Sequence, residues 1–158
     1  MKSPEESIAE VMRERKLTLA AAESCTGGRI GDKITDIPGS SDYFLGSAVT
    51  YSNAAKMKLL GVKKGSLGQF GAVSEQVAKE MAIGARKEFG SIIAMSTTGI
   101  AGPTGGSKEK PIGLVWFAVT DGNRIRTDRQ IFGGNRLEIK ESAANHAISL
   151  VIDFVRAL

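Results

Sequence analysis

Residues 17–28 read Leu-Thr-Leu-Ala-Ala-Ala-Glu-Ser-Cys-Thr-Gly-Gly, an apolar run that stops abruptly at polar and glycine residues. The apolar part, which ends at Ala22, has the length and character of a buried strand. Beyond it, Thr26-Gly27-Gly28 is expected to open a helix that carries Ile30 and Ile34 on one face. A buried strand that leads directly into an amphipathic helix is typical of a parallel sheet covered by helices.

The same alternation continues along the chain and then gives way to a hairpin. Asp121-Gly122 lies between residues 113–120 and 124–132 and is a turn signal for a hairpin. Ser3 and Asn53 are expected to cap helices. The expected strands are 17–22, 44–50, 92–96, 113–120 and 124–132, and the expected helices are about 4–16, from 26 to before 37, 53–60, 74–89 and 136–156.

This order of elements predicts an α/β fold. Parallel strands need crossover helices, whereas a two-residue turn makes its strands antiparallel. We therefore expect a single-domain three-layer α/β/α sandwich with a mixed, partly parallel sheet, formed by residues 1–158.

Composition limits the function classes. The chain has 158 residues, of which 42% are hydrophobic and 24% charged, as in ordinary globular proteins. Its net charge of +4 comes from scattered residues, without a basic stripe interleaved with aromatics, so an anionic small ligand is expected rather than nucleic acid. A single cysteine excludes an internal disulfide, and no apolar run reaches about 18 residues. We expect a cytoplasmic protein without a membrane segment.

Three polar segments follow the three strands of the alternating part: 23–28, 51–56 and 97–106. In open α/β sheets, ligands bind at the carboxyl ends of the strands, where these segments are expected to meet. Together they would bring Ser24, Lys56 and many backbone N–H groups to one edge of the sheet. With one histidine in the whole chain, a nucleophile here needs a base other than imidazole.

A Ser-Lys type of hydrolase meets this requirement. For Lys56 to act as the base, its pKa must fall from about 10.4 toward neutrality, which burial in a dry cleft can produce. Two plainer interpretations stay open: Ser24 or Thr26 merely caps the following helix, and Lys56 is a solvated helix lysine. Cys25 at a helix start is a second candidate nucleophile, although adjacent side chains usually diverge and Ser24 is preferred.

The glycine-rich segment 97–106 resembles a phosphate cradle. It lacks the glycine-lysine-serine order of a P-loop and does not match G-x-G-x-x-G, so neither an ATPase nor a dinucleotide site is supported. Thr98 is expected to turn its hydroxyl into the cleft. His146 on the last helix is interpreted as structural, and no cluster of residues has metal-ligand spacing. We expect no metal and no cofactor.

Taken together, the motifs resemble the C-terminal domain family of the competence/damage-inducible protein CinA, whose stand-alone members include nicotinamide-nucleotide amidohydrolases. The resemblance covers nearly the whole chain from about Ser7, and the combination is far more specific than any single motif. The motifs are E-S-C-T-G-G at 23–28, Y-S-N-x-x-K at 51–56, L-G-V at 60–62, G-A-V-S at 71–74, T-T-G-I-A-G-P-T-G-G at 97–106 and K-P-I-G-L-V-W-F-A at 110–118.

The resemblance implies hydrolysis of nicotinamide mononucleotide to nicotinic acid mononucleotide and ammonia, in pyridine-nucleotide salvage. By position, Ser24 resembles the nucleophile of the family, and Lys56, Tyr51 and Thr98 resemble its supporting residues. A homodimer is expected from the same likeness. Such chemistry needs N–H donors for an oxyanion and positive charge for a phosphate. The expected substrate-binding residues are Thr26, Gly27, Gly28, Gly99, Gly102 and Arg136.

One position departs from the family pattern, because Asn135 stands before Arg136 where relatives commonly have an aspartate. This change puts the orientation of Arg136, and with it the affinity for phosphate, in question. The main alternative function is a non-catalytic module of this competence- and damage-related family that binds a nucleotide or a protein partner.

Overall fold

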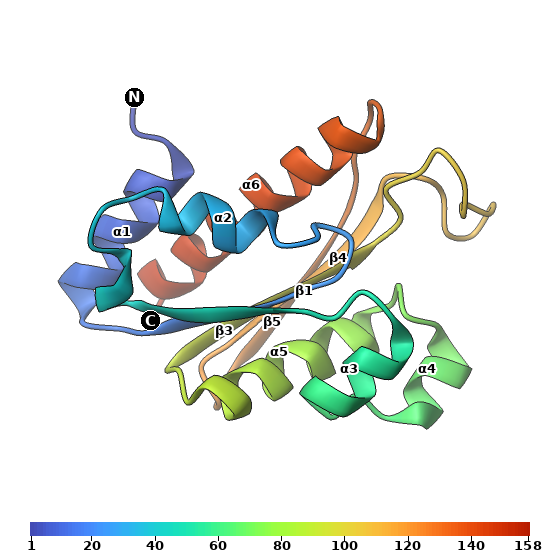
Figure 1. The fold of residues 1–158 in the computed structure, drawn as a ribbon, viewed down its shortest axis with the longest axis horizontal. Coiled ribbons are helices and arrows are strands. Elements are labelled where there is room, and N and C mark those ends of the chain that lie inside the picture. Colours follow the sequence, from blue (N-terminus) through green and yellow to red (C-terminus); the bar gives the residue numbers. More distant parts are fainter.

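The computed structural model describes all 158 residues. Six α-helices, one short 3-10 helix and five strands alternate along the chain (Figure 1). The strands are β1 (Leu19–Glu23), β2 (Phe44–Val49), β3 (Ile93–Gly99), β4 (Leu114–Thr120) and β5 (Ile125–Ile131). The helices are α1 (Pro4–Arg15), α2 (Arg29–Thr35), η1 (Ser40–Asp42), α3 (Asn53–Leu60), α4 (Lys64–Phe70), α5 (Glu75–Phe89) and α6 (Arg136–Arg156).

The five strands form one mixed sheet in the order β2-β1-β3-β4-β5. β1 pairs in parallel with the edge strand β2 on one side and with the central strand β3 on the other. β4 and β5 then continue the sheet antiparallel, joined by the predicted hairpin turn. Helices cover both faces: α1, α2 and α6 lie on one, and α3, α4 and α5 on the other (Figure 1). The predicted three-layer architecture with a mixed sheet is therefore confirmed.

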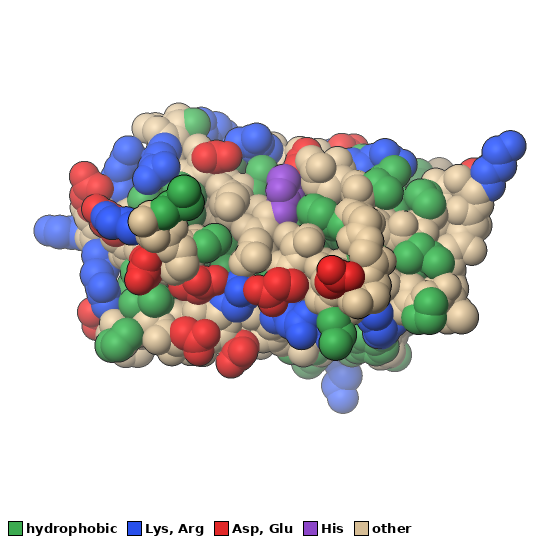
Figure 2. Space-filling model, turned by 90° about the horizontal axis from the view of Figure 1, so that it is seen from above, with side chains coloured by type: hydrophobic (Ala, Val, Ile, Leu, Met, Phe, Trp, Pro, Cys, Tyr) green, Lys and Arg blue, Asp and Glu red, His purple; other side chains and the backbone are tan.

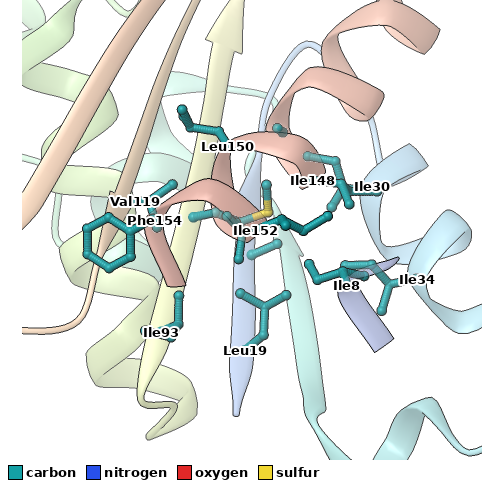
Figure 3. Packing of buried hydrophobic residues seen from close by; sticks show 14 of the residues in the cluster. Ile8, Leu19, Ile30, Ile34, Ile93, Val119, Ile148, Leu150, Ile152 and Phe154 are labelled. Carbon is teal, nitrogen blue, oxygen red and sulfur yellow. The ribbon is translucent and has the colours of Figure 1, made fainter. Parts of the chain in front are cut away.

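The larger core lies between the sheet and the layer formed by α1, α2 and α6. β1 contributes Leu19 from its fully buried run, and the amphipathic helices point Ile8, Ile30, Ile34 and Ile148 toward it (Figure 3). A smaller cluster under α5 includes Val77 and Met81. The helix predicted for residues 136–156 packs against the larger core, where α6 buries ten of its residues. Burial of this surface is the main force that holds the layers together.

Some local expectations need correction. Ser52, and not Asn53, caps α3 by accepting the N–H of Ala55. The helix expected to open at Thr26 starts at Arg29, after Gly28 in a left-handed conformation that provides no capping side chain. The sequence pattern missed α4, which is short, contains two glycines and has no buried residue.

The topology places a crevice where the strand order reverses. From β1 the chain moves to β2 on one side, and it then crosses to β3 on the other side, so the carboxyl ends of β1 and β3 diverge at this point. Ligands bind at such switch points in open α/β sheets. The outer surface over α1, α2 and α6 shows Lys and Arg interspersed with Asp and Glu (Figure 2). None of the helices has the length and apolar character needed to span a membrane.

Candidate active site

A cavity of about 260 Å³ lies at the carboxyl ends of the three parallel strands. All three polar segments contribute to it, as the sequence predicted. The cavity is lined by Ser24, Cys25, Tyr51, Asn53, Lys56, Ala72, Val73, Thr98, Gly99, Ala101 and Arg136. Its size suits a small molecule or the reacting end of a larger one.

Lys56 is buried beneath this cavity, with only 1% of its surface exposed. α3 holds it on the side that faces β1, and its amine reaches back to the loop between β2 and α3. The Lys56 Nζ lies 3.0 Å from the Ser24 Oγ, 2.9 Å from the carbonyl oxygen of Thr50 and 3.3 Å from that of Tyr51. The interpretation of Lys56 as a solvated helix lysine is therefore wrong.

The surroundings of Lys56 disfavour its positive charge. Burial lowers the pKa of the amine below its ordinary value, because the charged form loses its hydration. No carboxylate forms an ion pair with it. The Lys56 Nζ donates to the Ser24 Oγ and to the carbonyl oxygens of Thr50 and Tyr51. A neutral amine could keep the two bonds to the carbonyl oxygens and accept the Ser24 hydroxyl with its lone pair. The arrangement thus places an amine with a lowered pKa within hydrogen-bond distance of a serine hydroxyl.

Ser24 sits in the tight turn between β1 and α2. Its own N–H donates to the carbonyl oxygen of Thr97 on β3, which fixes the turn to the neighbouring strand. Neither Cys25 nor Thr26 has an oxygen acceptor within the protein for its backbone N–H. These two N–H groups follow Ser24 directly in the chain, and Cys25 is one of the residues that line the cavity.

Cys25 also lines the cavity, but its thiol is poorly suited to attack. Burial raises the pKa of Cys25 to about 12, so the reactive thiolate is disfavoured at neutral pH. This agrees with the preference for Ser24.

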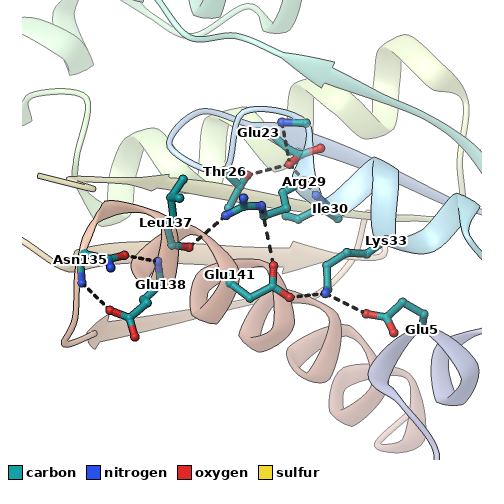
Figure 4. Close-up of polar contacts among 11 residues, drawn as sticks. Glu5, Glu23, Thr26, Arg29, Ile30, Lys33, Asn135, Leu137, Glu138 and Glu141 are labelled. Atoms are coloured by element: carbon teal, nitrogen blue, oxygen red, sulfur yellow. Dashed lines mark hydrogen bonds and ion pairs between the residues drawn. The ribbon is translucent and has the colours of Figure 1, made fainter.

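The start of α2 does not serve a ligand as the sequence suggested. Glu23, which is fully buried, places its carboxylate there and accepts the N–H groups of Gly28, Ile30 and Gly31 (Figure 4). The N–H of Gly27 is also used, since it donates to the carbonyl oxygen of Ser24. Two of the expected donors, Gly27 and Gly28, are therefore already engaged within the protein.

The side chain of Thr26, expected to cap a helix or bind substrate, points into the protein instead. Its side chain is buried and neither caps α2 nor reaches the cavity. The Thr26 Oγ1 instead donates to the Glu23 Oε1 over 2.7 Å, and it lies 3.0 Å from the Thr97 Oγ1. Thr26 can contact a ligand only through its backbone N–H.

Tyr51 and Arg136 form the outer rim of the cavity. The Tyr51 side chain is 64% exposed, and its phenol accepts a hydrogen bond from Arg136 over 3.0 Å, away from the Ser24–Lys56 pair. Arg136 also donates to the carbonyl oxygen of Gly102 over 2.6 Å. Gly102 thus offers a carbonyl to the arginine, and Tyr51 reaches Lys56 only through its backbone. Arg136 remains well placed for an anionic group at the rim.

Thr98 and Gly99 line the cavity from β3. The hydroxyl of Thr98, expected to face the cleft, donates to the carbonyl oxygen of Ala72 over 2.8 Å. It thereby holds the loop before α5 against β3. Gly99 allows β4 to pass closely, since an added Cβ would lie 2.6 Å from the carbonyl oxygen of Leu114.

Asn135 is the N-cap of α6. Its side chain accepts the N–H of Glu138, whose carboxylate in turn accepts the N–H of Asn135 (Figure 4). Asparagine and aspartate are about equally good at this task. Asn135 makes no contact with the Arg136 guanidinium, so the departure from the family pattern leaves the orientation of Arg136 intact.

Sequence reasoning missed two charged residues near the site. Glu23 is one, and Lys140, one turn after Arg136 on α6, is the other. An added Cβ on Gly27 would lie 3.4 Å from the Lys140 Nζ, which puts this ammonium beside the turn after Ser24. His146 lies outside the cavity: its Nε2 is 2.5 Å from the Asp128 Oδ2, and its ring packs on Phe117.

Comparison with known proteins shows the family of the chain. A family model described as the CinA C-terminal domain matches residues 1–155. The chain belongs to the CinA C-terminal domain family. A putative competence-damage inducible protein of Moorella thermoacetica is 49% identical over 93% of this chain and 36% of its own length. A CinA-like protein of Chloroherpeton thalassium is 48% identical over 97% of this chain and 37% of its own length. The chain thus spans about a third of the length of these relatives.

Solved structures of CinA proteins share the fold over their whole length. A competence/damage-inducible protein from Agrobacterium tumefaciens is 39% identical with a TM-score of 0.91, covering 97% of this chain and 96% of that one. A CinA superfamily protein from Klebsiella pneumoniae is 30% identical with a TM-score of 0.95, covering 99% of this chain and 100% of that one. The mixed sheet described above is therefore the CinA C-terminal domain fold.

Proposed function

We propose that this CinA domain hydrolyses the carboxamide of nicotinamide mononucleotide to nicotinic acid mononucleotide and ammonia, with Ser24 as nucleophile and Lys56 as base. The observation that carries the proposal is the buried amine without a counterion, 3.0 Å from a serine hydroxyl in the wall of a cavity. Such an amine has lost the hydration that keeps lysine protonated, so it can take a proton from the alcohol.

The first half-reaction forms an ester. The Ser24 Oγ attacks the carboxamide carbon while the Ser24 proton passes to the Lys56 Nζ, and the carbonyl oxygen becomes an oxyanion. The free N–H groups of Cys25 and Thr26 stabilise this charge. The Lys56 ammonium then gives its proton to the amide nitrogen, the C–N bond breaks, and ammonia leaves the acyl-Ser24 ester.

The second half-reaction returns the enzyme to its starting state. Water attacks the ester carbon and gives a proton to the neutral Lys56, and the same N–H groups hold the new oxyanion. Collapse of this intermediate releases the carboxylic acid, and Lys56 returns its proton to the Ser24 oxygen. Each proton that the reaction moves thus passes through one amine.

Two features favour this substrate class. Arg136 at the rim and Lys140 beside the turn offer positive charge for a phosphate outside the reaction centre. The pyridinium ring of the mononucleotide is a cation, and a cation near Lys56 favours its neutral form further. A neutral amide without a phosphate would have neither advantage.

The test is ammonia release from nicotinamide mononucleotide, compared with free nicotinamide and the dinucleotide. We expect release from the mononucleotide, with losses of about 10³-fold or more in Ser24→Ala and Lys56→Met. Cys25→Ala is the matched control and is expected to stay within a few-fold of the parent protein. Release from none of the three compounds would favour a binding module, and loss of activity only in Cys25→Ala would assign the nucleophile to the thiol.

A further inference from the structure

Glu23 immediately precedes the proposed nucleophile Ser24, and the hydrolysis proposed above gives it no role. Its side chain is fully buried and forms no ion pair. An acid is seldom buried without compensation, since the loss of hydration is costly. The compensation consists of five hydrogen bonds, from Thr26 Oγ1, Ser47 Oγ and the N–H groups of Gly28, Ile30 and Gly31.

All five groups act as donors toward Glu23. Three are backbone N–H groups, which cannot accept. The set suits a carboxylate, which has about four lone-pair sites and only accepts. A glutamine of the same shape would turn an NH₂ group toward at least one of these N–H groups. The site therefore selects for the acid and against its amide.

The contacts join three parts of the fold at one point. Glu23 ends β1, Ser47 lies on the neighbouring β2, and Ile30 and Gly31 are in the first turn of α2. α2 has no capping side chain of its own, because its N-cap is Gly28. The carboxylate takes the place of that cap and meets the positive end of the helix dipole.

The Thr26 hydroxyl links Glu23 to the turn from Ser24 to Thr26. A hydroxyl has one proton, and Thr26 gives it to Glu23 over 2.7 Å, so the Thr97 hydroxyl donates to Thr26 over 3.0 Å. The turn from Ser24 to Thr26 is thereby held at both ends: by the Ser24 N–H on Thr97 and by the Thr26 side chain on Glu23. Between these two ties lie the N–H groups of Cys25 and Thr26.

We propose that Glu23 is a positioning residue for amide hydrolysis, which acts through the Thr26 hydroxyl to fix the turn that carries the Ser24 hydroxyl and the two oxyanion donors. The proposal rests on the hydrolase function proposed above. Glu23 touches neither substrate nor Lys56. Its effect is expected in the transition state, where the donors must meet a developing charge, and not in the binding of substrate.

Thr26→Val is the sharpest test, because it keeps the shape of the side chain and removes the hydroxyl. Displacement of catalytic groups by about 1 Å can cost about 10²-fold in rate. We expect Thr26→Val to lose about 10²-fold in kcat with KM within about twofold, and Thr26→Ser to recover most of the loss. Glu23→Gln is expected to show the same split, with an unchanged pH profile, since the acid acts through geometry.

Thr120→Val is the matched control. Thr120 is also a buried threonine with two hydrogen bonds, to Arg124 and Gly122, but it lies at the β4–β5 hairpin, away from the cavity. Thr120→Val should lower the Tm by about as much as Thr26→Val does, and should keep the kcat of the parent protein. The proposal is overturned if Thr26→Val keeps kcat within twofold, or if kcat falls by the same factor in Thr120→Val.

Labelling of Ser24 by a fluorophosphonate separates this proposal from the hydrolase function. If the parent protein is labelled but releases no ammonia, the proposed substrate is wrong and the role of Glu23 is still measured. In that case Thr26→Val must be labelled about 10²-fold more slowly than the parent protein and Thr120→Val at the parent rate. Equal labelling rates for the three proteins would overturn the positioning role.

Discussion

Gly84 on α5 is a position where two physical effects oppose each other. Replacement of a helical glycine by alanine stabilises a helix by about 1 kcal/mol in an open environment. At Gly84, however, the added Cβ would lie 1.9 Å from the carbonyl oxygen of Leu60, the last residue of α3. An ordinary contact needs about 3.4 Å, so α3 must retreat by about 1.5 Å.

The retreat has consequences for stability and for catalysis. α5 is packed into the sheet, whereas α3 packs mainly on α5, so α3 is the element that moves. Overpacking of this kind costs about 1–3 kcal/mol, which exceeds the helix-propensity gain over most of that range. α3 also carries Lys56, whose Nζ needs its 3.0 Å contact with the Ser24 Oγ. Gly84→Ala is therefore expected to lose about 10²-fold in kcat, although it lies outside the cavity.

The assay compares thermal unfolding and ammonia release with those of Gly68→Ala. Gly68 is also helical, on α4, and an added Cβ there meets nothing within 4 Å. We expect a Tm lower by about 3–6 °C for Gly84→Ala and a small increase for Gly68→Ala. A Tm for Gly84→Ala equal to or above that of the parent protein would refute the reasoning, because propensity would then outweigh the contact with Leu60.

Four further outcomes follow from the site. Because burial lowers the pKa of Lys56, kcat/KM should rise with pH through that lowered value, and a profile without this limb would contradict Lys56 as the base. The free energy of unfolding should also rise with pH between the lowered pKa of Lys56 in the folded protein and its ordinary pKa in the unfolded chain. In this range only the unfolded chain holds the Lys56 proton. Urea titrations of Lys56→Met should show no such rise. Asn135→Ala should lower the free energy of unfolding by about 1 kcal/mol, measured by thermal unfolding. Asn135→Asp should leave it almost unchanged, since asparagine and aspartate cap a helix about equally well. Arg136→Met should raise KM for the mononucleotide about tenfold or more without a comparable fall in kcat, and equal values for the two proteins would remove Arg136 from phosphate binding.

The sequence predicted the layout of the fold because its cues are local. Short apolar runs ending in polar residues marked the first strands, and the hairpin turn at Asp121 marked the antiparallel pairing of β4 with β5. The carboxyl-end rule then brought Ser24 and Lys56 to one cavity. What the pattern did not contain was the burial of Lys56, because that depends on tertiary contacts such as the one with Ser24, 32 residues away in the sequence.

The start of α2 could be misread for a similar reason. Glycines before a helix leave N–H groups that favour an anion, and the sequence alone does not say whose anion it is. An acid next to a glycine-rich turn, before a helix without a capping side chain, is the signal that would have identified Glu23. The same oversight made Thr26 look like a ligand contact, when its hydroxyl faces inward to that acid.

Two buried ionisable groups lie near Ser24, Glu23 and Lys56, and their hydrogen-bond partners differ in kind. The carboxylate of Glu23 receives five donors, which replace the hydration it has lost. The amine of Lys56 receives only two neutral carbonyls and a hydroxyl, which compensate a positive charge poorly. Burial lowers the pKa of this amine, so it can gain and lose a proton more easily than an exposed lysine. Because the Glu23 carboxylate also occupies the N-terminus of α2, the donors left for a developing oxyanion are the N–H groups next to Ser24, close to the Lys56 amine.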